Sequence, residues 1–306
     1  MLDVRQARRW LALTVPVAAL CAALAPGQAG AQARLDARYT ASLAGLPIGE
    51  GTWEIVIGDG DYSATAKGST TGLMKAFTGG HGQTVTQGTL QAGKPALSSY
   101  TASIQSYKKG NEISLKVDGG AVKELKLDPP AETEPERVPV TDASKSGVLD
   151  PMTATLVRMP GNGELMSAEA CQRKLPVFDG RLRYDLTLAF KRIEQVKADK
   201  GYAGPAVVCS VNFTPVAGYI PTRAAIKYLQ EQRNIEIWLA PIGSTRVLVP
   251  FRIEGPTPVG LAVLEADEFV VTALPPTVRA STRSKEKPTR AAASESPRAS
   301  ETKTTP

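Results

Sequence analysis

The 306-residue sequence has one histidine and three cysteines, and it lacks both a Cys-x-x-Cys pair and a Gly-x-Ser-x-Gly turn. A serine or cysteine triad needs a histidine base, and His81 lies in a glycine-rich segment far in sequence from any nucleophile motif. Structural zinc sites use several cysteines and histidines at set spacings. The composition therefore argues against triad hydrolases and metal centres, and it implies no cofactor.

The N-terminus carries the features of an export signal. Three arginines precede an apolar run over residues 10–25, and small residues follow it. This order is typical of a signal peptide covering residues 1–31, with cleavage expected after Ala31 or Ala33. The run is shorter than the roughly 20 residues that a membrane-spanning helix needs. We therefore expect a periplasmic protein without a transmembrane segment; the alternatives are a membrane anchor or a lipoprotein signal at Cys21.

The C-terminal end, residues 275–306, is rich in Ser, Thr, Pro, Lys and Arg and contains no aromatic residue. Such a composition cannot bury a core, so we expect a disordered basic tail. The signal and the tail carry all of the excess positive charge, which leaves residues 32–274 with equal numbers of basic and acidic side chains. This balance argues against nucleic-acid binding by the body. The tail either contacts anionic envelope polymers or lipid headgroups, or has no partner.

Short alternating segments separated by turns dominate residues 32–274. The expected strands lie at residues 37–43, 52–57, 62–67, 83–90, 96–105, 111–117, 121–127, 182–190, 207–213, 234–239, 246–254 and through 269–272. The best helix candidate is 151–159, where Asp150 suits the N-cap and Pro151 the first turn, and weaker candidates are 70–77 and 222–232. The pattern predicts a mainly β domain: a single curled antiparallel sheet, an open or half barrel, with one or two short helices, one of which fills the concave side.

Between Cys171 and Cys209 lies the clearest hairpin signal. Asp179-Gly180 is typical of a two-residue turn with positive φ at both positions. The alternation after the turn predicts a buried Phe190 and a solvent-facing Asp185. Hence this segment is expected to be a strand pair with one face in the core.

Removal of the signal leaves Cys171 and Cys209 as the remaining cysteines. Cys209 occupies an apolar position of its strand, and an even cysteine count in an oxidising compartment is normally paired. We expect a disulfide, which for a loop of this length contributes roughly 4 kcal/mol in the chain-entropy model. The alternatives are two buried thiols or a metal pair.

Several stretches of the body resemble one family. They are residues 45–49, 71–73, 150–156, 175–184 with Cys171, 204–211, 214–219, 237–241 and 249–253. They are similar to exported Gram-negative proteins of domain-of-unknown-function family 3108. The matching motif residues are Asp150, Pro151, Phe178, Asp179, Gly180, Arg181, Tyr184, Pro205, Pro215, Gly218, Trp238, Pro241 and Pro250. More distantly, the layout resembles the half-barrels of periplasmic lipoprotein-carrier proteins, which hold a helix or acyl chain in their concavity. The resemblance implies a fold and no particular activity.

Aromatic residues are the candidates for a ligand site. In an open sheet, Tyr184, Phe213, Trp238 and Phe251 would line an apolar cleft, and otherwise they form the core. We therefore expect a non-enzymatic envelope factor that binds or scaffolds an apolar ligand or partner peptide, with a lipid or envelope protein as partner.

Acidic residues carry the alternative, a hydrolase or transferase acting on envelope glycans or lipids. Asp150, Asp179 and Asp185 would supply its acid and base. Their simpler roles are an N-cap, a turn residue and an outward strand position.

Overall fold

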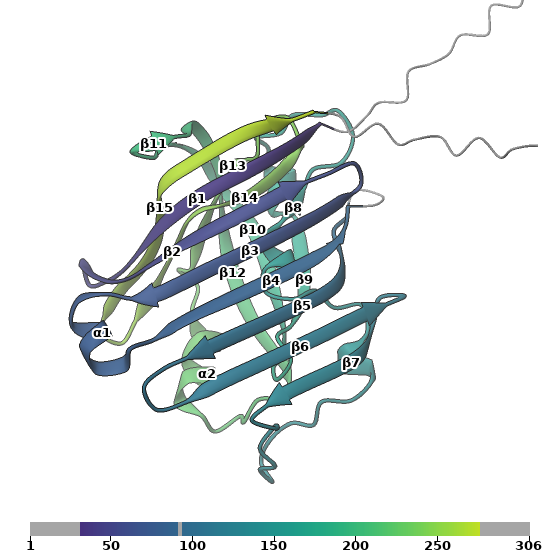
Figure 1. Ribbon diagram of the computed structural model, residues 1–306, viewed down its shortest axis with the longest axis vertical. Helices are drawn as coiled ribbons and strands as arrows, with labels where there is room; N and C mark the ends of the chain where they lie inside the picture. Colours follow the sequence, from purple (N-terminus) through teal and green to yellow (C-terminus); the bar gives the residue numbers. More distant parts are fainter. Residues whose placement is uncertain (1–30, 91–93, 276–306) are drawn as a thin grey trace, which may run out of the picture. The chain divides into compact units, whose positions relative to one another are not determined.

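The computed structural model describes residues 31–90 and 94–275 (Figure 1). Apart from Ala31 and Pro275, the expected signal peptide and basic tail lie outside the described residues. Strands make up most of the described chain, namely β1 (Gln32–Leu43), β2 (Leu46–Ile57), β3 (Asp61–Thr70), β4 (His81–Thr89), β5 (Ala96–Gln105), β6 (Gly110–Asp118), β7 (Ala121–Asp128), β8 (Val157–Arg158), β9 (Arg173–Phe178), β10 (Arg183–Lys197), β11 (Lys200–Gly201), β12 (Ala203–Ala217), β13 (Glu236–Pro241), β14 (Val247–Thr257) and β15 (Gly260–Leu274).

Helical structure is sparse. The described residues contain α1 (Gly72–Thr78), α2 (Ala224–Glu231) and the short 3-10 turns η2 (Ala143–Lys145), η3 (Thr153–Thr155) and η4 (Ala168–Cys171). Neither α1 nor α2 is a candidate membrane span. The mainly β class with two short helices is confirmed.

One sheet joins all the strands. The order of its main path is β7-β6-β5-β4-β3-β2-β1-β15-β14-β13-β12-β10-β9, with antiparallel neighbours throughout. Off this path, β8 pairs with β14, and β11 pairs parallel with β15. Strands β1–β7 form a front layer in Figure 1, and β9, β10 and β12–β14 lie behind it. The predicted single curled sheet is therefore confirmed.

The two edge strands, β7 and β9, do not pair with each other. Instead, the loop that follows η2 spans between them. Ser146 forms a bridge with Ala121 of β7, and Leu149 forms a parallel bridge with Val177 of β9. The amide of Phe178 also donates to the carbonyl of Leu149 at 2.8 Å. After this loop the chain passes from the edge of the curled sheet into the space that the sheet encloses.

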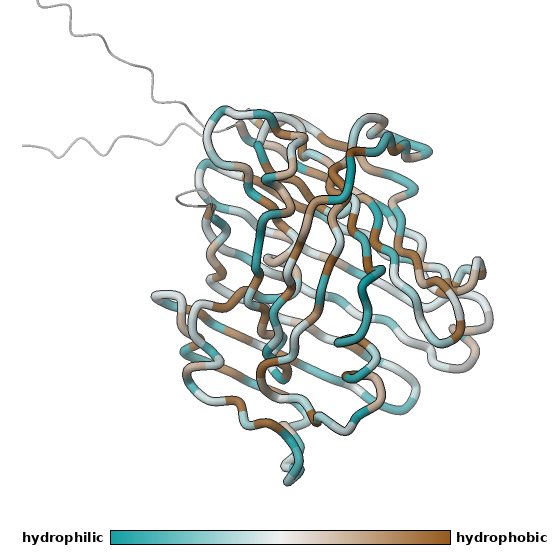
Figure 2. Tube along the Cα trace, turned by 180° about the vertical axis from the view of Figure 1, so that it is seen from behind, coloured by the Kyte–Doolittle hydropathy of each residue, from teal (hydrophilic) through white to brown (hydrophobic). Residues whose placement is uncertain are grey.

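Apolar side chains fill two cores, and Figure 2 shows apolar positions alternating with hydrophilic ones along many strands. The first core lies on the inner face of the front layer, which carries Leu35 and Ile55. The second surrounds the disulfide between Cys171 and Cys209, both fully buried. The predicted pairing of these cysteines is confirmed. In β12, Val207 packs in the second core and Val208 in the first, so this strand is buried on both faces.

The predicted α-helix over residues 151–159 is wrong. Asp150 does accept hydrogen bonds from the amides of Met152 and Thr153, as an N-cap would. The helix then stops after η3, and Val157–Arg158 forms β8 against β14. The pairing of β8 with β14, which is distant in the sequence, thus overrides the local preference for a helix.

The hairpin at Asp179 is present, but its turn differs from the prediction. Positive φ occurs at Gly180 and not at Asp179. The Asp179 carboxylate accepts the amides of Arg181 and Leu182, at 2.8 and 2.7 Å. This side-chain bonding makes a four-residue loop in place of the two-residue turn.

The predicted alternation along β10 holds only in part. Asp185 is buried rather than solvent-facing, because it pairs with Lys174 and Arg183 at 2.9 and 2.7 Å. Phe190 is 42% exposed, and it lies beyond the part of β10 that pairs with β9. The face of this strand that was expected to be buried therefore includes an exposed residue, Phe190, and the face that was expected to be exposed includes a buried one, Asp185.

Candidate functional site

A row of three glycines crosses the inner face of the front layer. Gly51, Gly68 and Gly82 are directly paired on β2, β3 and β4. Tyr39 continues the row on β1, and Ile104 continues it on β5. Because side chains on one face stand side by side across a sheet, three adjacent glycines leave a hollow in that face.

A cavity of about 440 Å³ lies over the glycine row, and we call it the front cavity. Trp53 borders it on the front layer. From the opposite side, Met152, Pro250 and Leu264 complete a wall that is almost wholly apolar. This volume falls in the range typical of small-molecule sites, roughly 300–1,000 Å³.

A second apolar space, the rear cavity, has a volume of about 270 Å³. Tyr184 and Phe213 line it, with ring centroids 5.3 Å apart. Pro151, Thr155 and Ile253 border both cavities. The segment that follows Asp150 therefore separates two apolar spaces inside the curled sheet.

A buried polar cluster anchors that segment to the front layer. Asp150, Thr86 and Thr153 are fully buried. The Asp150 carboxylate accepts hydrogen bonds from the hydroxyls of Thr86, at 2.9 Å, and of Thr153. The hydroxyls of Tyr62 and Thr153 lie 2.6 Å apart. Side chains of β3 and β4 thus hold the start of the segment in place.

Burial raises the pKa of the Asp150 carboxyl, and the hydrogen bonds from Thr153, Thr86 and Met152 oppose this rise. Within the described residues, no Lys, Arg or His forms an ion pair with it. The environment is that of a buried acceptor that fixes backbone and hydroxyl groups.

The other two candidate carboxylates have separate surroundings. Asp179 binds the backbone of its own turn. At Asp185, burial acts to raise the pKa, but hydrogen bonds and ion pairs with Lys174 and Arg183 lower it overall. No hydrogen bond joins Asp150, Asp179 or Asp185 to another of the three.

Trp238, one of the four predicted cleft residues, lies away from both cavities. It alternates with Ile237 and Leu239, which line the rear cavity, so its ring is on the other face of β13. There the guanidinium carbons of Arg192 and Arg252 lie 5.5 and 5.0 Å from the ring centroid. This geometry stabilises the cations over the indole.

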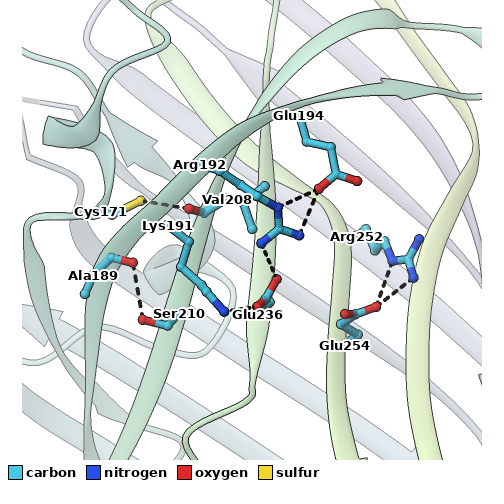
Figure 3. Close-up of polar contacts among 10 residues, drawn as sticks. All are labelled: Cys171, Ala189, Lys191, Arg192, Glu194, Val208, Ser210, Glu236, Arg252 and Glu254. Atoms are coloured by element: carbon cyan, nitrogen blue, oxygen red, sulfur yellow. Dashed lines mark hydrogen bonds and ion pairs between the residues drawn. The ribbon is translucent and has the colours of Figure 1, made fainter.

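Acidic side chains surround those cations in Figure 3. The Glu236 carboxylate pairs with Lys191 and, at 2.9 Å, with Arg192. Burial acts to raise the pKa of Glu236, but the two cations lower it overall. Arg252 pairs with Glu254 at 2.6 Å. Arg192 also pairs with Glu194 at 2.8 Å, so three carboxylates neutralise the three cations.

Phe251 belongs to an aromatic group rather than to a cavity wall. Its ring centroid lies 5.7 Å from that of Phe269 and 6.4 Å from that of Tyr202. Of the four predicted residues, the structure therefore brings Tyr184 and Phe213 together at a cavity and places Trp238 and Phe251 elsewhere.

Motif residues gather where the β9–β10 turn meets the β6–β7 edge. A Cβ atom at Gly180 would lie 2.6 Å from Ile113, which explains the need for glycine there. The Arg181 guanidinium donates to the Pro129 carbonyl at 2.6 Å. At Gly218, φ is +80° and a Cβ atom would lie 1.9 Å from the Arg181 carbonyl oxygen. These residues hold the two ends of the sheet near each other.

The remaining motif residues have structural positions. Phe178 is fully buried in the first core. The Pro250 carbonyl accepts the Tyr39 hydroxyl at 2.6 Å, and the Pro205 carbonyl accepts the Tyr202 hydroxyl at 2.7 Å. Pro215 and Pro241 lie in β12 and β13.

A family model described as "Protein of unknown function (DUF3108)" matches residues 38–267. The chain belongs to this family. No curated protein matches it. Among solved structures, it is similar to the crystal structure of a β-barrel-like protein of domain of unknown function DUF1849 from Brucella abortus, with a TM-score of 0.46 and 11% identity over 79% of this chain and 98% of that chain. The family match includes the glycine row, the Asp150 cluster and both cavities.

The glycine row was not recognised from sequence. Each glycine lies one residue outside the end of a predicted strand, and two residues from Trp53, Ala66 or Thr84, so that it continues the inward positions of that strand. The pairing of these positions follows from the register of β2, β3 and β4, which the sequence pattern leaves open.

Proposed function

We propose that the protein is an exported, non-enzymatic binding factor of the cell envelope that holds an apolar ligand inside its curled sheet. The observation that carries the proposal is the front cavity, an apolar space of about 440 Å³ over three paired glycines. Its wall lacks a cluster of charged side chains, so it favours an acyl chain or an apolar peptide segment over a polar substrate.

The proposed location, the periplasm, is supported by the expected export signal and by the disulfide. A disulfide such as Cys171–Cys209 persists in oxidising compartments such as the periplasm. The apolar signal segment and the small residues after it support the same location.

Filling the front cavity tests the proposal. Gly68 is the best position, because a Cβ atom there meets just one atom within 4 Å, the Glu50 carbonyl oxygen at 3.6 Å. Gly68→Leu should therefore fold while its side chain occupies ligand space. Gly163→Leu is the matched control, since a Cβ atom at Gly163 meets nothing within 4 Å and the residue lies outside the front cavity.

The measurement has two parts. Native mass spectrometry after detergent-free purification should show a co-purified apolar molecule on the wild-type protein and on Gly163→Leu. Titration with a fluorescent fatty acid should show binding by both proteins. Gly68→Leu should bind the probe at least roughly tenfold more weakly than the wild type, and a tenfold change in Kd equals about 1.4 kcal/mol. Wild-type protein without a bound molecule and without affinity for the probe would contradict the proposal.

A further inference from the structure

Exposed apolar side chains concentrate at one end of the sheet. Of the twelve large hydrophobic side chains that are exposed in the described residues, seven lie there. We call these seven the apolar rim: Leu46, Met74, Ile104, Tyr107, Val259, Leu261 and Leu264. Leu46, Tyr107 and Val259 are 69, 68 and 68% exposed, more than any of the others. Contiguous exposed apolar surface of this kind marks interaction sites in soluble domains.

Hydrogen bonds join the segments of the rim into one continuous edge. The Ala44 amide donates to the Leu261 carbonyl at 2.8 Å, which links the β1–β2 turn to the start of β15. The Thr71 amide donates to the Ile48 carbonyl at 3.0 Å and so places α1 beside β2. The Tyr107 amide donates to the Thr78 carbonyl at 3.0 Å, which joins the β5–β6 turn to α1. Figure 1 shows α1 and the β1–β2 turn at the same end of the front layer.

The front cavity reaches the surface at this edge. Ile104 and Leu264 line the cavity and also belong to the apolar rim, where they are 51 and 36% exposed. Gly82 is the second residue of β4, and Ile104 is the last but one of β5. The cavity mouth and the rim are therefore parts of one surface.

Basic side chains are interleaved with the rim. Lys75 lies next to Met74 on α1, and Lys108 and Lys109 follow Tyr107. All three are exposed, and within the described chain none is in an ion pair. The acidic residues near the rim include Glu50 on β2, Glu112 on β6 and Glu265 on β15. The Glu112 carboxylate accepts hydrogen bonds from Ser103 and Gln105, and Glu265 pairs with Arg252 at 3.6 Å.

Apolar side chains at turn tips, mixed with lysines, match the chemistry of an anionic membrane surface. The apolar groups enter the boundary of the acyl region, and the ammonium groups meet lipid phosphates. We propose that the apolar rim docks on an anionic lipid bilayer, which places the mouth of the front cavity against the membrane. This interaction goes beyond the proposed ligand binding, because a cavity can hold a ligand without touching a membrane.

The test is vesicle flotation of the mature full-length protein and its variants. The vesicles contain phosphatidylcholine and phosphatidylglycerol in equal parts, with phosphatidylcholine alone for comparison. Leu46→Ser combined with Val259→Ser should weaken binding to the mixed vesicles roughly tenfold or more, because two exposed apolar side chains lose their membrane contact.

Charge reversal tests the second part of the surface. Lys108→Glu combined with Lys109→Glu should weaken binding to the mixed vesicles by at least roughly tenfold, given about 1 kcal/mol for each lysine, and change binding to phosphatidylcholine little. Leu125→Ser and Lys227→Glu are matched controls, since both residues are exposed outside the rim. The basic tail is present in every variant, so its own attraction to the vesicles cancels in the comparison.

Three outcomes would overturn the inference. The first is a wild-type protein that does not float with mixed vesicles, and the second is rim variants that bind as well as the controls. The third is a wild-type oligomer that light scattering shows to dissociate in Leu46→Ser/Val259→Ser, which would assign the rim to contacts between copies. Gly68→Leu should keep vesicle binding while it loses the ligand, so failure of docking and failure of ligand binding are distinguishable. Thermal unfolding of each variant confirms that it is folded.

Discussion

Removal of the Asp150 carboxylate gives the sharpest test of how the inside of the sheet is organised. The carboxylate accepts two backbone amides and two hydroxyls. Asp150→Ala deletes all four acceptor contacts, while Asp150→Asn keeps a carbonyl oxygen and nearly the same shape. We therefore expect a large loss of stability in the alanine variant and a small one in the asparagine variant.

The magnitude follows from the partners that are left behind. Loss of an N-cap costs about 1 kcal/mol. A buried polar group without a partner costs about 1–3 kcal/mol, but Thr86 keeps the Ser99 carbonyl and Thr153 keeps the Tyr62 hydroxyl. We expect Asp150→Ala to lower the free energy of unfolding by about 3 kcal/mol, and Asp150→Asn by about 1 kcal/mol.

Urea unfolding at neutral pH, followed by tryptophan fluorescence with the disulfide intact, measures both values. Glu231→Ala, at the exposed end of α2, is a control that should change stability little. Equal losses in Asp150→Ala and Asp150→Asn would refute the view that this carboxylate acts as the acceptor that anchors the segment.

The pH dependence of the same pair supplies an independent check. Because burial raises the folded-state pKa of Asp150 above its unfolded value of 3.8, protonation favours the folded state. The stability that this adds is fully present below the unfolded pKa and is lost as pH rises through the folded pKa. Relative to Asp150→Asn, the wild type should therefore gain stability as the pH falls from 7 towards 4. A constant difference between the two proteins, or one of opposite sign, would contradict the burial effect.

Two further predictions concern the covalent staple and the β9–β10 turn. Reduction of the Cys171–Cys209 bond, which closes a loop of 38 residues, should lower the free energy of unfolding by about 4 kcal/mol, measured by urea unfolding with and without reductant; a change below about 1 kcal/mol would oppose this. Gly180→Ala should cost more than Gly119→Ala, because both have positive φ but only at Gly180 does a Cβ atom meet Ile113. Equal shifts in melting temperature for the two alanine variants would show that this close contact is unimportant.

Local patterns in the sequence were sufficient for much of the fold. Alternating segments bounded by turns located the strands, and β5 begins and ends at the predicted residues, Ala96 and Gln105. Alternation of apolar and polar residues marks a strand with one buried and one exposed face, so such a strand can be recognised without knowing which strand it pairs with. The even cysteine count that is expected once a signal peptide with Cys21 is removed likewise predicted the disulfide.

The site depended on contacts between distant segments. The aromatic pair Tyr184 and Phe213 reached a cavity as expected, but Trp238 and Phe251 did not. A bulge between Trp238 and Leu239 shifts the pairing of β13 with β14, and the sequence period carries no mark of it. Aromatic content alone therefore could not tell cavity wall from core.

The sequence by itself determined the mainly β class of the protein, the approximate positions of its strands and its disulfide. The class and the strands follow from the local alternation of apolar and polar residues, and the disulfide follows from the number of cysteines. Tertiary structure alone decided that residues 151–158 form a turn and a strand inside the sheet, since β14 supplies the pairing partner for β8. It also decided that Gly51, Gly68 and Gly82 stand side by side. The register between the strands brings these glycines together, and it thereby forms the cavity in which we propose that the ligand binds.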